Sequence, residues 1–275
     1  MKAIDVSLHQ GKIDWAKVKA SGIEAVIIRC LKRSGVDDYW LTNYNGAKAV
    51  GLKVGVYVFS YAQTEQYAIT EASRCLTQIK GKDLDFPVWL DLEWETQGKL
   101  GRAKVTSIAK AFMETIKAGG YECGIYSNQS WHDKLIDWVE LGNPDWWAAR
   151  IGKKPTGTYT IHQYDWYGKV NGISGNVDMD DIIKDYSDDY YAPVGKLGWV
   201  QDAKGDWYYR DTPTTNVHGW KKVNGHWYYF DGNGKMLTGW FEVDGKKYFA
   251  EDSNAKLLGA LYRTDDSGAQ SIWDV

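Results

Sequence analysis

The sequence predicts an α/β protein, an irregular (β/α) barrel of eight strands, followed by a small all-β domain of hairpin repeats that stack as a solenoid. The barrel is predicted from residues 2 to about 185, where short apolar runs alternate with amphipathic helical stretches, the pattern of a parallel sheet. The solenoid is predicted from a period of about 20 residues in the last third of the chain, because a fixed period indicates stacked units. We therefore expect a barrel over 1–186, a linker over 187–197 and repeats over 198–275.

Eight apolar runs are expected to form the barrel, and strands that alternate with helices in this number suggest closure. The strands are expected over 2–5, 25–30, 53–59, 87–92, 122–126, 147–150, 160–164 and 176–179. The helices are expected over 14–20, 39–50, 65–79 and 103–118, with C-cap glycines at Gly22, Gly51 and Gly119. The last three strands leave little room for helices between them, so the barrel is expected to be irregular.

Gly-Trp pairs mark the repeats. They stand at 198–199, 219–220 and 239–240, with Gly259-Ala260 as a degenerate fourth, so the glycines are 21, 20 and 20 residues apart. A second aromatic cluster follows at 207–209, 227–229 and 247–249. The segments 231–234 and 243–245 have the composition of hairpin turns. Each unit is therefore expected to be one hairpin that covers its neighbour.

Tryptophan and tyrosine are unusually abundant, with 15 Trp and 19 Tyr against 6 Phe. Some of the tryptophans must form the core of the repeats, but a small stack of hairpins needs fewer. The faces of aromatic rings attract cationic groups. We therefore interpret the repeats as a ligand-binding array, with a purely structural core as the alternative.

The composition excludes several classes of protein. Hydrophobic residues make up 44% and charged residues 25%, as in a soluble globular chain. With 33 basic and 36 acidic residues the net charge is -3, so nucleic acid is not an expected partner. No apolar run approaches the roughly 20 residues that span a bilayer, so membrane insertion is not expected. The N-terminus lacks the apolar segment of a signal peptide, so synthesis in a cytoplasm is expected. The three cysteines, Cys30, Cys75 and Cys123, show no metal-ligand spacing, so buried free thiols are expected.

Two carboxylates end the apolar run at 86–92. Asp91 and Glu93 on one strand would share a face, roughly 6–7 Å apart for a rise of about 3.3 Å per residue. At the C-terminal end of a barrel strand they would point into the active-site opening. This pair is weak support by itself, and a divalent metal site or a solvated strand end are alternatives. The five histidines show no ligand pairing, so neither a metal nor a cofactor is expected.

Two further acids strengthen the catalytic interpretation. Asp5 ends the first expected strand and Asp178 lies in the last, and these strands are neighbours in a closed barrel. All four acids could therefore meet at one opening. Crowded acids raise one another's pKa, so one stays protonated while another is ionised, as glycoside hydrolysis requires. The estimated spacing exceeds the roughly 5–5.5 Å of a direct carboxylate nucleophile, which leaves inversion or assistance by a 2-acetamido group of the substrate.

These motifs resemble glycoside hydrolase family 25, the family of lysozymes that includes many phage endolysins. The resemblance covers essentially residues 1–186, through the segments 5–11, 13–15, 55–57, 91–93, 124–128, 162–164 and 175–178. It implies a β/α barrel that cleaves the β-1,4 bond after N-acetylmuramic acid in peptidoglycan. It also implies that Glu93 is the proton donor and Asp91 its carboxylate partner. Asp5 and Asp178 would complete the acidic floor.

The resemblance further implies three residues that line the sugar site, Tyr57, Tyr126 and Gln163. For the two tyrosines, ordinary packing at the barrel opening is the alternative. His162 departs from the tryptophan of many relatives, and this departure would alter a sugar-stacking wall while leaving the acids untouched.

The tail resembles choline-binding repeats, most clearly over 219–240. In such repeats two tryptophans of one unit and an aromatic residue of the next form a cage around a quaternary ammonium, often beside a methionine. The expected cage residues are Trp220, Trp227, Met236 and Tyr248 in one site, and Trp199, Trp207 and Tyr228 in a second. Choline on teichoic acid would be the wall ligand. Similar repeats also bind other glycans, and such repeats can pair two chains into a homodimer.

Together these features predict a peptidoglycan hydrolase of the endolysin type, a muramidase barrel followed by wall-binding repeats. A second interpretation is an N-acetylglucosaminidase or chitinase-type hydrolase, because substrate assistance suits any 2-acetamido sugar. A third is a non-catalytic wall-binding protein, against which the intact acid set counts. The missing signal peptide suits release through a holin-made membrane lesion, and a bacterial autolysin is the alternative origin.

Overall fold

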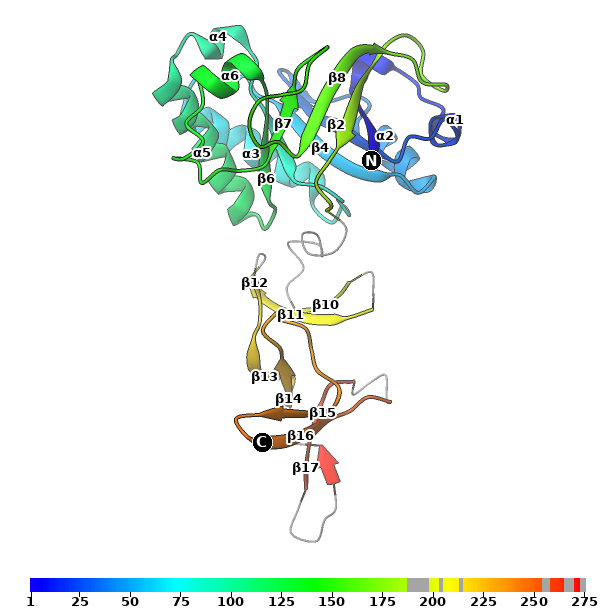
Figure 1. Cartoon of the computed structure of the whole chain (residues 1–275), viewed down its shortest axis with the longest axis vertical. Coiled ribbons are helices and arrows are strands. Elements are labelled where there is room, and N and C mark those ends of the chain that lie inside the picture. The colour runs from blue at the N-terminus through cyan, green and yellow to red at the C-terminus, as the bar shows by residue number, and fades with distance from the viewer. Residues whose placement is uncertain (187–197, 203–204, 213–214, 254–257, 265–269, 273–275) are drawn as a thin grey trace. The chain divides into compact units, whose positions relative to one another are not determined.

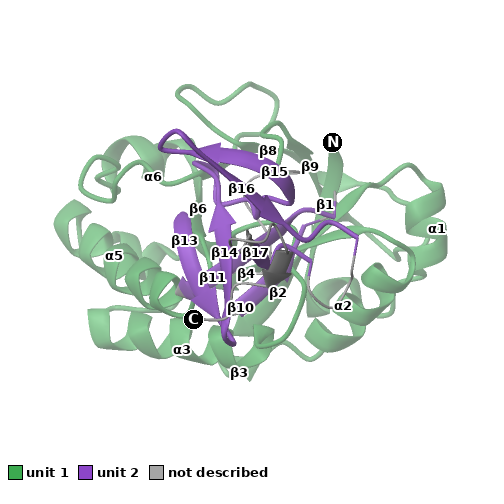
Figure 2. Cartoon of the chain, turned by 90° about the horizontal axis from the view of Figure 1, so that it is seen from below, with its two compact units in different colours: residues 1–191 green, residues 192–275 purple. Residues whose placement is uncertain are grey.

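The computed structural model describes residues 1–186, 198–202, 205–212, 215–253, 258–264 and 270–272 (Figure 1). The chain divides into two compact units, residues 1–191 and 192–275 (Figure 2). The predicted linker, 187–197, lies outside the described residues. The boundary between the units falls within it.

The first unit contains the predicted eight-stranded closed barrel. The strands are β1 (Lys2–Val6), β2 (Ala25–Lys32), β4 (Lys53–Phe59), β5 (Val88–Asp91), β6 (Cys123–Asn128), β7 (Trp146–Ala149), β8 (Ile161–Gly168) and β9 (Val177–Ile182). The ring closes because β1 pairs with both β2 and β9. A short strand, β3 (Gly35–Val36), forms a hairpin with the end of β2. The β2 sequence is apolar on both faces and almost wholly buried, as expected for a strand between a barrel interior and a layer of helices.

The last strand runs in the opposite direction to the other seven. Strands β1, β2 and β4 to β8 pair in parallel, whereas β9 is antiparallel to β1 and to β8. The prediction of a parallel sheet is therefore wrong for β9. The physical reason is the short connection over 169–176, because a parallel crossover needs a dozen or more residues. As a result, the beginning of β9 lies at the same opening as the C-terminal ends of the other strands.

Helices cover the outside of the barrel (Figure 1). Four match the predicted segments: α1 (Trp15–Ala20), α2 (Trp40–Ala49), α3 (Glu65–Ile79) and α5 (Arg102–Ala118). Three short ones, η1 (Leu8–Gln10), α4 (Glu95–Gly98) and α6 (Gln129–Lys134), were not expected, because one turn or two carry no apolar periodicity. Gly22 and Gly51 have φ of 84° and 69°, as C-cap glycines do, but Gly119 has φ of -77° and Gly120 takes the left-handed conformation instead, with φ of 86°.

The interior of the barrel is filled by side chains rather than open. Phe86, Trp89 and Trp147 are fully buried there, and the two tryptophan rings meet edge to face with centroids 5.8 Å apart. Any substrate must therefore bind at an end of the barrel. The three cysteines are buried and free, as predicted.

The second unit consists of small antiparallel sheets, as predicted. Its strands are β10 (Gly198–Gln201), β11 (Trp207–Thr212), β12 (Thr215–Asn216), β13 (Gly219–Val223), β14 (His226–Phe230), β15 (Gly239–Val243), β16 (Lys246–Ala250), β17 (Leu261–Thr264) and β18 (Gln270–Ile272). Each of the three Gly-Trp pairs opens the first strand of a hairpin. Two hairpins turn at Asn224-Gly225 and Asp244-Gly245, where both residues of each pair have positive φ, the geometry that suits the twist of a two-residue hairpin.

Candidate active site

A cavity of about 260 Å³ opens at the end of the barrel where β1 and β5 finish and β9 begins. Its lining includes all seven residues that the sequence predicted for the site in this unit: Asp5, Tyr57, Asp91, Glu93, Tyr126, Gln163 and Asp178. The remaining lining residues are Ser7, His9, Gln10, Arg29, Phe59 and Trp147. The predicted acids therefore lie at one opening.

The reversed strand β9 brings two of these acids together. Asp5 on β1 pairs directly with Asp178 on β9 in the antiparallel register. Asp178 is the second residue of β9, so in a parallel β9 it would lie at the far end of the barrel. The sequence argument predicted the proximity of the two acids but not the strand direction that produces it.

Asp91 and Glu93 reach the cavity in different ways. Asp91 is the last residue of β5 and is buried, with 4% of its surface exposed. Glu93 lies beyond the strand, in the connection to α4, and is exposed at the opening. The prediction that both acids share a strand face is therefore wrong, because β5 ends at Asp91. Both carboxylates still line the cavity.

The Gln163 amide links the two sides of the cavity through hydrogen bonds. Its Nε2 donates to Asp5 Oδ2 at 2.8 Å, and its Oε1 accepts from the Tyr126 hydroxyl at 2.9 Å. The indole Nε1 of Trp166 donates to the same Oε1 at 2.8 Å. The Tyr126 hydroxyl also lies 3.5 Å from Glu93 Oε2. These bonds fix the orientation of the amide and connect the surroundings of Asp5 with those of Glu93.

The deepest acids are the hardest to ionise. Burial is the largest cause of a pKa well above the ordinary value at Asp5 and at Asp91. The negative charge of Asp178 adds to the rise at Asp5, and that of Glu93 adds to the rise at Asp91. Asp91 Oδ1 is buried and has no hydrogen-bond partner among the described residues, which adds to the cost of ionising this carboxyl.

The two outer acids are also shifted. Partial loss of water around the Glu93 carboxylate raises its pKa, the hydrogen bond from Tyr126 opposes that rise, and the charge of Asp178 adds to it. Burial, followed by the charge of Asp165, raises the pKa of Asp178 to about 6. Carboxyls of different accessibility with raised pKa values suit general acid chemistry near neutral pH.

Arg29 is the cation that lines this cavity, and sequence reasoning missed it. Its guanidinium is 2.8 Å from Asp37 Oδ2 through both Nε and Nη2, and the Leu8 amide also donates to that oxygen at 3.1 Å. The positive charge of Arg29 opposes the rise in the pKa of Asp91, but Arg29 shares that charge with Asp37. A single arginine within the apolar run at 25–31 was a sequence signal that could have identified it.

A fifth acid, Asp180, lies beneath the cavity and was also missed. It is fully buried and accepts a hydrogen bond from Trp147 Nε1 at 2.7 Å. Its other oxygen, Oδ2, is buried and has no hydrogen-bond partner among the described residues. Burial and the charge of Asp5 raise the pKa of Asp180 well above its ordinary value. The sequence signal that could have identified Asp180 was its spacing of two residues from Asp178, since this spacing places both side chains on one face of a strand.

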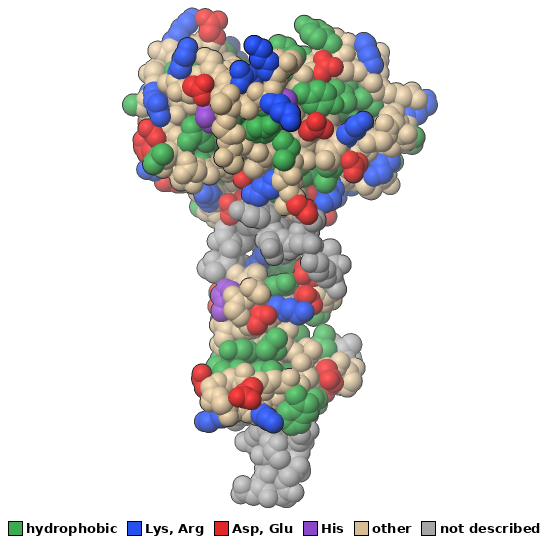
Figure 3. All heavy atoms as spheres, viewed as in Figure 1, with side chains coloured by type: hydrophobic (Ala, Val, Ile, Leu, Met, Phe, Trp, Pro, Cys, Tyr) green, Lys and Arg blue, Asp and Glu red, His purple; other side chains and the backbone are tan. Residues whose placement is uncertain are grey.

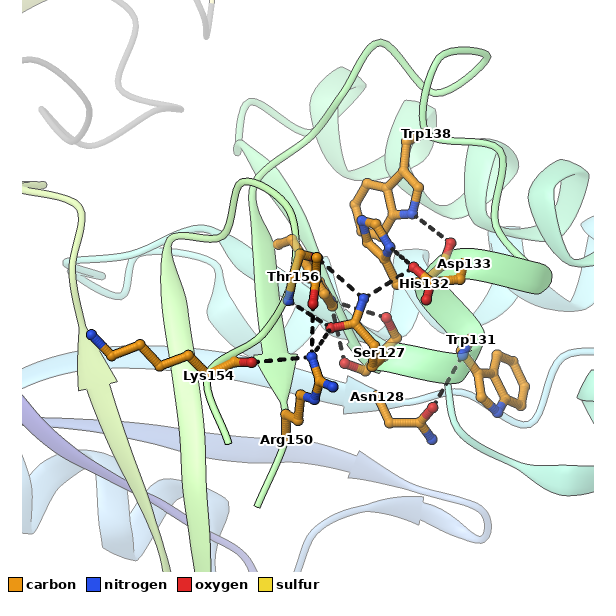
Figure 4. A network of polar contacts seen from close by, with 11 residues as sticks. Ser127, Asn128, Trp131, His132, Asp133, Trp138, Arg150, Lys154 and Thr156 are labelled. Carbon is orange, nitrogen blue, oxygen red and sulfur yellow. Dashed lines mark hydrogen bonds and ion pairs between the residues drawn. The ribbon is translucent and has the colours of Figure 1, made fainter. Parts of the chain in front are cut away.

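A polar network beside the cavity holds the connection between β7 and β8 (Figure 4). Arg150 Nη1 donates to Gln129 Oε1, to the Lys154 carbonyl and to Thr156 Oγ1, at 3.2, 3.1 and 2.8 Å. The ring of His162 bonds to the Arg150 carbonyl at 2.9 Å and is not among the cavity-lining residues. The expected change of a sugar-stacking wall at His162 stays a prediction.

A stacked pair of rings lies in the same network. The imidazole of His132 stacks on the indole of Trp146 with centroids 3.8 Å apart, and its Nδ1 is 2.7 Å from Asp133 Oδ1. Trp146 Nε1 donates to the Ser127 carbonyl at 3.2 Å. These contacts attach α6 to the barrel next to the strand that carries Tyr126.

Two groups of aromatic residues in the described part of the second unit contain predicted cage residues, and hydrophobic side chains gather on the visible face of this unit (Figure 3). In one group the Trp220 ring lies 4.8 Å from Tyr248, as predicted for the first cage, and also 4.8 Å from Tyr229 and 6.4 Å from Phe241. Trp227 faces the same side of its hairpin as Trp220, with Lys222 Nζ 6.0 Å from its ring.

The second predicted cage is also brought together. Trp199 lies 6.3 Å from Trp207 and 4.6 Å from the buried Tyr228, measured between ring centroids. Met236 is buried in this group, with Tyr228 and Phe230, and its predicted contact with the Trp220 cage stays a prediction. It also fills the space beside Gly259, where any side chain would collide with it.

The third hairpin carries a cavity that the sequence did not indicate. It has a volume of about 430 Å³ and is lined by Trp240, Phe241, Glu242 and Lys247. Lys247 occupies the strand position that Trp227 has in the preceding hairpin.

The described residues contain no cluster of three or more His, Cys, Asp or Glu side chains with the arrangement of a metal site. None of their helices has the length and apolar character that a membrane span requires.

Family models match both parts of the chain. The model of glycosyl hydrolases family 25 matches residues 4–173. A choline-binding repeat model matches residues 217–258, and a cell wall binding repeat model matches residues 198–212.

Individual relatives agree with these matches. The "Autolytic lysozyme" of Clostridium acetobutylicum is 30% identical over 187 residues, which cover 66% of this chain and 56% of that protein. The modular autolysin LytC from Streptococcus pneumoniae, solved with a synthetic peptidoglycan ligand, is 26% identical with a TM-score of 0.60, over 65% of this chain and 46% of LytC. The CTP1L endolysin is 28% identical with a TM-score of 0.57, over 67% of each chain. The chain thus spans about half the length of the curated lysozyme and of LytC.

We expect Asp180→Asn to stabilise the protein at pH 7 but not at pH 4. The folded state holds the Asp180 proton above the ordinary carboxyl pKa while the unfolded chain releases it, so stability falls as pH rises from about 4 towards the raised folded pKa. Asparagine has no proton to release, so it avoids this loss of stability, and its side-chain oxygen can still accept the hydrogen bond from Trp147 Nε1. The gain should be about 1–3 kcal/mol at pH 7, or roughly 3–10 °C in Tm.

Thermal unfolding at both pH values measures this effect. Asp181→Asn, at the exposed neighbouring position, is the matched control and should show no pH-dependent gain. An equal Tm increase for Asp180→Asn at pH 4 and pH 7 would contradict the assignment of a buried proton to Asp180.

Proposed function

The chain belongs to glycosyl hydrolases family 25, and from that premise we propose that it hydrolyses peptidoglycan as a lysozyme. The bond that we propose is the β-1,4 linkage between N-acetylmuramic acid and N-acetylglucosamine. The observation that carries the proposal is the group of acids at one barrel opening, with Glu93 and Asp5 linked through Tyr126 and Gln163. An acidic cavity with carboxyls of different accessibility provides both a proton donor and a negative charge for an oxocarbenium-like transition state.

Glu93 is the proton donor in this proposal. It is the exposed member of the group, so it can reach a glycosidic oxygen, and its raised pKa favours the protonated form that a general acid requires. Tyr126 contacts Glu93 and can stabilise the carboxylate after proton transfer.

Asp91 is the partner carboxyl. It lines the same cavity as Glu93, so its carboxyl could orient the 2-acetamido group of a bound sugar. Asp178, with a pKa of about 6, supplies negative charge at the same opening, where positive charge develops on the sugar, and it lies opposite Asp5 in the strand register. These roles suit substrate assistance and an inverting reaction alike, because Glu93 donates the proton in both.

The repeats are proposed to bind choline on wall teichoic acid. The support is the group of Trp220, Tyr229, Phe241 and Tyr248, whose ring faces can surround a quaternary ammonium. Binding through the repeats would raise the concentration of the barrel at its substrate without any new contact at the cleavage site. Pairing of two chains through the repeats is part of the same proposal.

We further propose that the protein acts as an endolysin, made in a bacterial cytoplasm and released to the wall through a holin-made lesion. Similarity to the CTP1L endolysin supports this setting, whereas the autolytic lysozyme and LytC are bacterial autolysins. The chemistry at the cavity is the same in either case.

The reducing end of the products tests the bond specificity. A digest of purified peptidoglycan, reduced with borohydride and hydrolysed, should yield muramitol as the new reduced sugar. Glucosaminitol would instead show an N-acetylglucosaminidase, and the absence of any new reducing end would indicate a non-catalytic wall-binding protein.

Glu93→Gln should lower the rate of wall solubilisation by about 10²- to 10⁴-fold, because glutamine cannot donate the proton. Turbidity loss of purified walls gives the rate, and sedimentation with walls shows that binding persists. Glu95→Gln is the matched control, since Glu95 is an exposed acid two residues away that pairs with Lys99 at 3.1 Å. A Glu93→Gln variant with the wild-type rate would contradict the role of Glu93.

Millimolar choline should compete with wall binding, and Trp220→Ala should weaken binding about 5- to 30-fold, the range expected for a desolvated cation–π contact. Co-sedimentation with choline-containing walls provides the measurement. Trp240→Ala is the comparison variant and should have a smaller effect, because Lys247 stands where a cage tryptophan would be needed. Full binding at saturating choline would exclude choline and favour a glycan ligand.

A further inference from the structure

Trp166 is a large apolar side chain exposed next to the acidic cavity. Its exposed fraction is 47%, although most tryptophans of the barrel unit are buried or half-buried. It lies on β8, three residues after Gln163, towards the end of the strand. A single exposed apolar side chain is common on a protein surface, but one beside a polar cavity is in a position to contact a bound ligand.

The backbone of β8 is irregular at this position. The pairing with β9 shifts register between Gln163 and Asp165, and again between Asp165 and Gly168. Bulges at barrel rims redirect side chains that strict alternation would point elsewhere. Here the irregular segment lets the Trp166 indole reach the side chain of Gln163, which faces the cavity.

The hydrogen bond of the indole determines what the exposed ring can bind. Trp166 Nε1 donates to Gln163 Oε1 at 2.8 Å, so the polar atom of the ring is already satisfied by the protein. The exposed part of the ring is then its apolar surface. Such a surface suits the C–H face of a pyranose ring better than a charged or strongly hydrogen-bonding group.

The same bond couples the ring to the acids. Gln163 Nε2 donates to Asp5 at 2.8 Å, and Gln163 Oε1 also accepts from Tyr126, which contacts Glu93. A sugar that stacks on Trp166 would therefore contact the ring whose N–H orients the Gln163 amide between Asp5 and Glu93. The ring thus has two separable features, an apolar face and a single N–H.

We propose that Trp166 is a sugar-stacking platform that binds a pyranose of the glycan strand next to the cleavage site, and that its indole N–H holds the Gln163 amide in the orientation the acids require. This inference rests on the proposed function, since it assigns one sugar subsite of the same cavity. The ring face contributes to substrate binding, and the N–H contributes to the catalytic step.

Steady-state kinetics on soluble peptidoglycan glycan strands, freed of their stem peptides, separate the two features. Trp166→Ala removes both and should raise KM about 5- to 10-fold and also lower kcat. Trp166→Phe keeps an aromatic face but loses the N–H, so KM should stay within about twofold while kcat falls severalfold.

Tyr167→Ala is the matched control for the hairpin that β8 and β9 form. Tyr167 is the next residue on β8, is 69% exposed and has no role in the cavity, so its loss should leave KM and kcat near the wild-type values. Melting temperatures of all three variants should match that of the wild type.

The outcomes distinguish this inference from the proposed function. If the wild type does not cleave glycan strands, the proposed function itself fails. If the wild type is active and Trp166→Ala has an unchanged KM, the platform is overturned while the function stands. Equal losses in Trp166→Ala and Tyr167→Ala would show a structural role of the hairpin and would also overturn the platform.

Discussion

The antiparallel pairing of β9 between β1 and β8 is the constraint on which the site depends. It closes the barrel and, because β9 is reversed, its first residues lie at the opening where the parallel strands end. Asp178 is thereby placed opposite Asp5 at the rim, and Asp180 two residues deeper in the barrel. The same pairing sets Gln163 opposite Asp180 on the other side of the strand. One short connection over 169–176 therefore determines both the closure of the fold and the arrangement of its acids.

Electrostatic repulsion in this small volume explains the polar groups around the acids. Five carboxyls face one arginine whose charge is shared with Asp37, so they cannot all be ionised at neutral pH. Donors from Gln163 and Trp147 stabilise individual carboxyls, and the filled aromatic interior below keeps these donors in place. Water excluded by that interior raises the pKa of the deepest acids, while Glu93 at the rim remains accessible. Burial and the charges of neighbouring acids thus distinguish the accessible proton donor, Glu93, from the deepest acids, which are the hardest to ionise.

The repeats use a different principle, in which strand alternation divides each hairpin into a core face and an outer face. On β13 and β14, Val223, Tyr228 and Phe230 are buried, while Trp220 and Tyr229 lie on the other face. The next hairpin then contributes Phe241 and Tyr248 to that second face. In the third hairpin Lys247 replaces the tryptophan, so the outer face there combines Trp240 with a pair of opposite charges, Glu242 and Lys247. The array therefore changes character towards the end of the chain.

The sequence by itself determined the eight barrel strands, the four long helices, the hairpin repeats and the acids of the cavity, because each is encoded by local periodicity or by a short motif. Tertiary structure alone decided the direction of β9, the end of β5 before Glu93, the place of Met236 in the second aromatic group, and the contributions of Arg29 and Trp166. Strand direction follows from how much chain is available to cross the barrel, and side-chain partners follow from register shifts and packing between segments distant in sequence. The contacts of Arg29 and Met236 join segments distant in sequence, whereas the direction of β9 and the Trp166–Gln163 bond depend on backbone geometry that the local pattern of apolar residues does not encode.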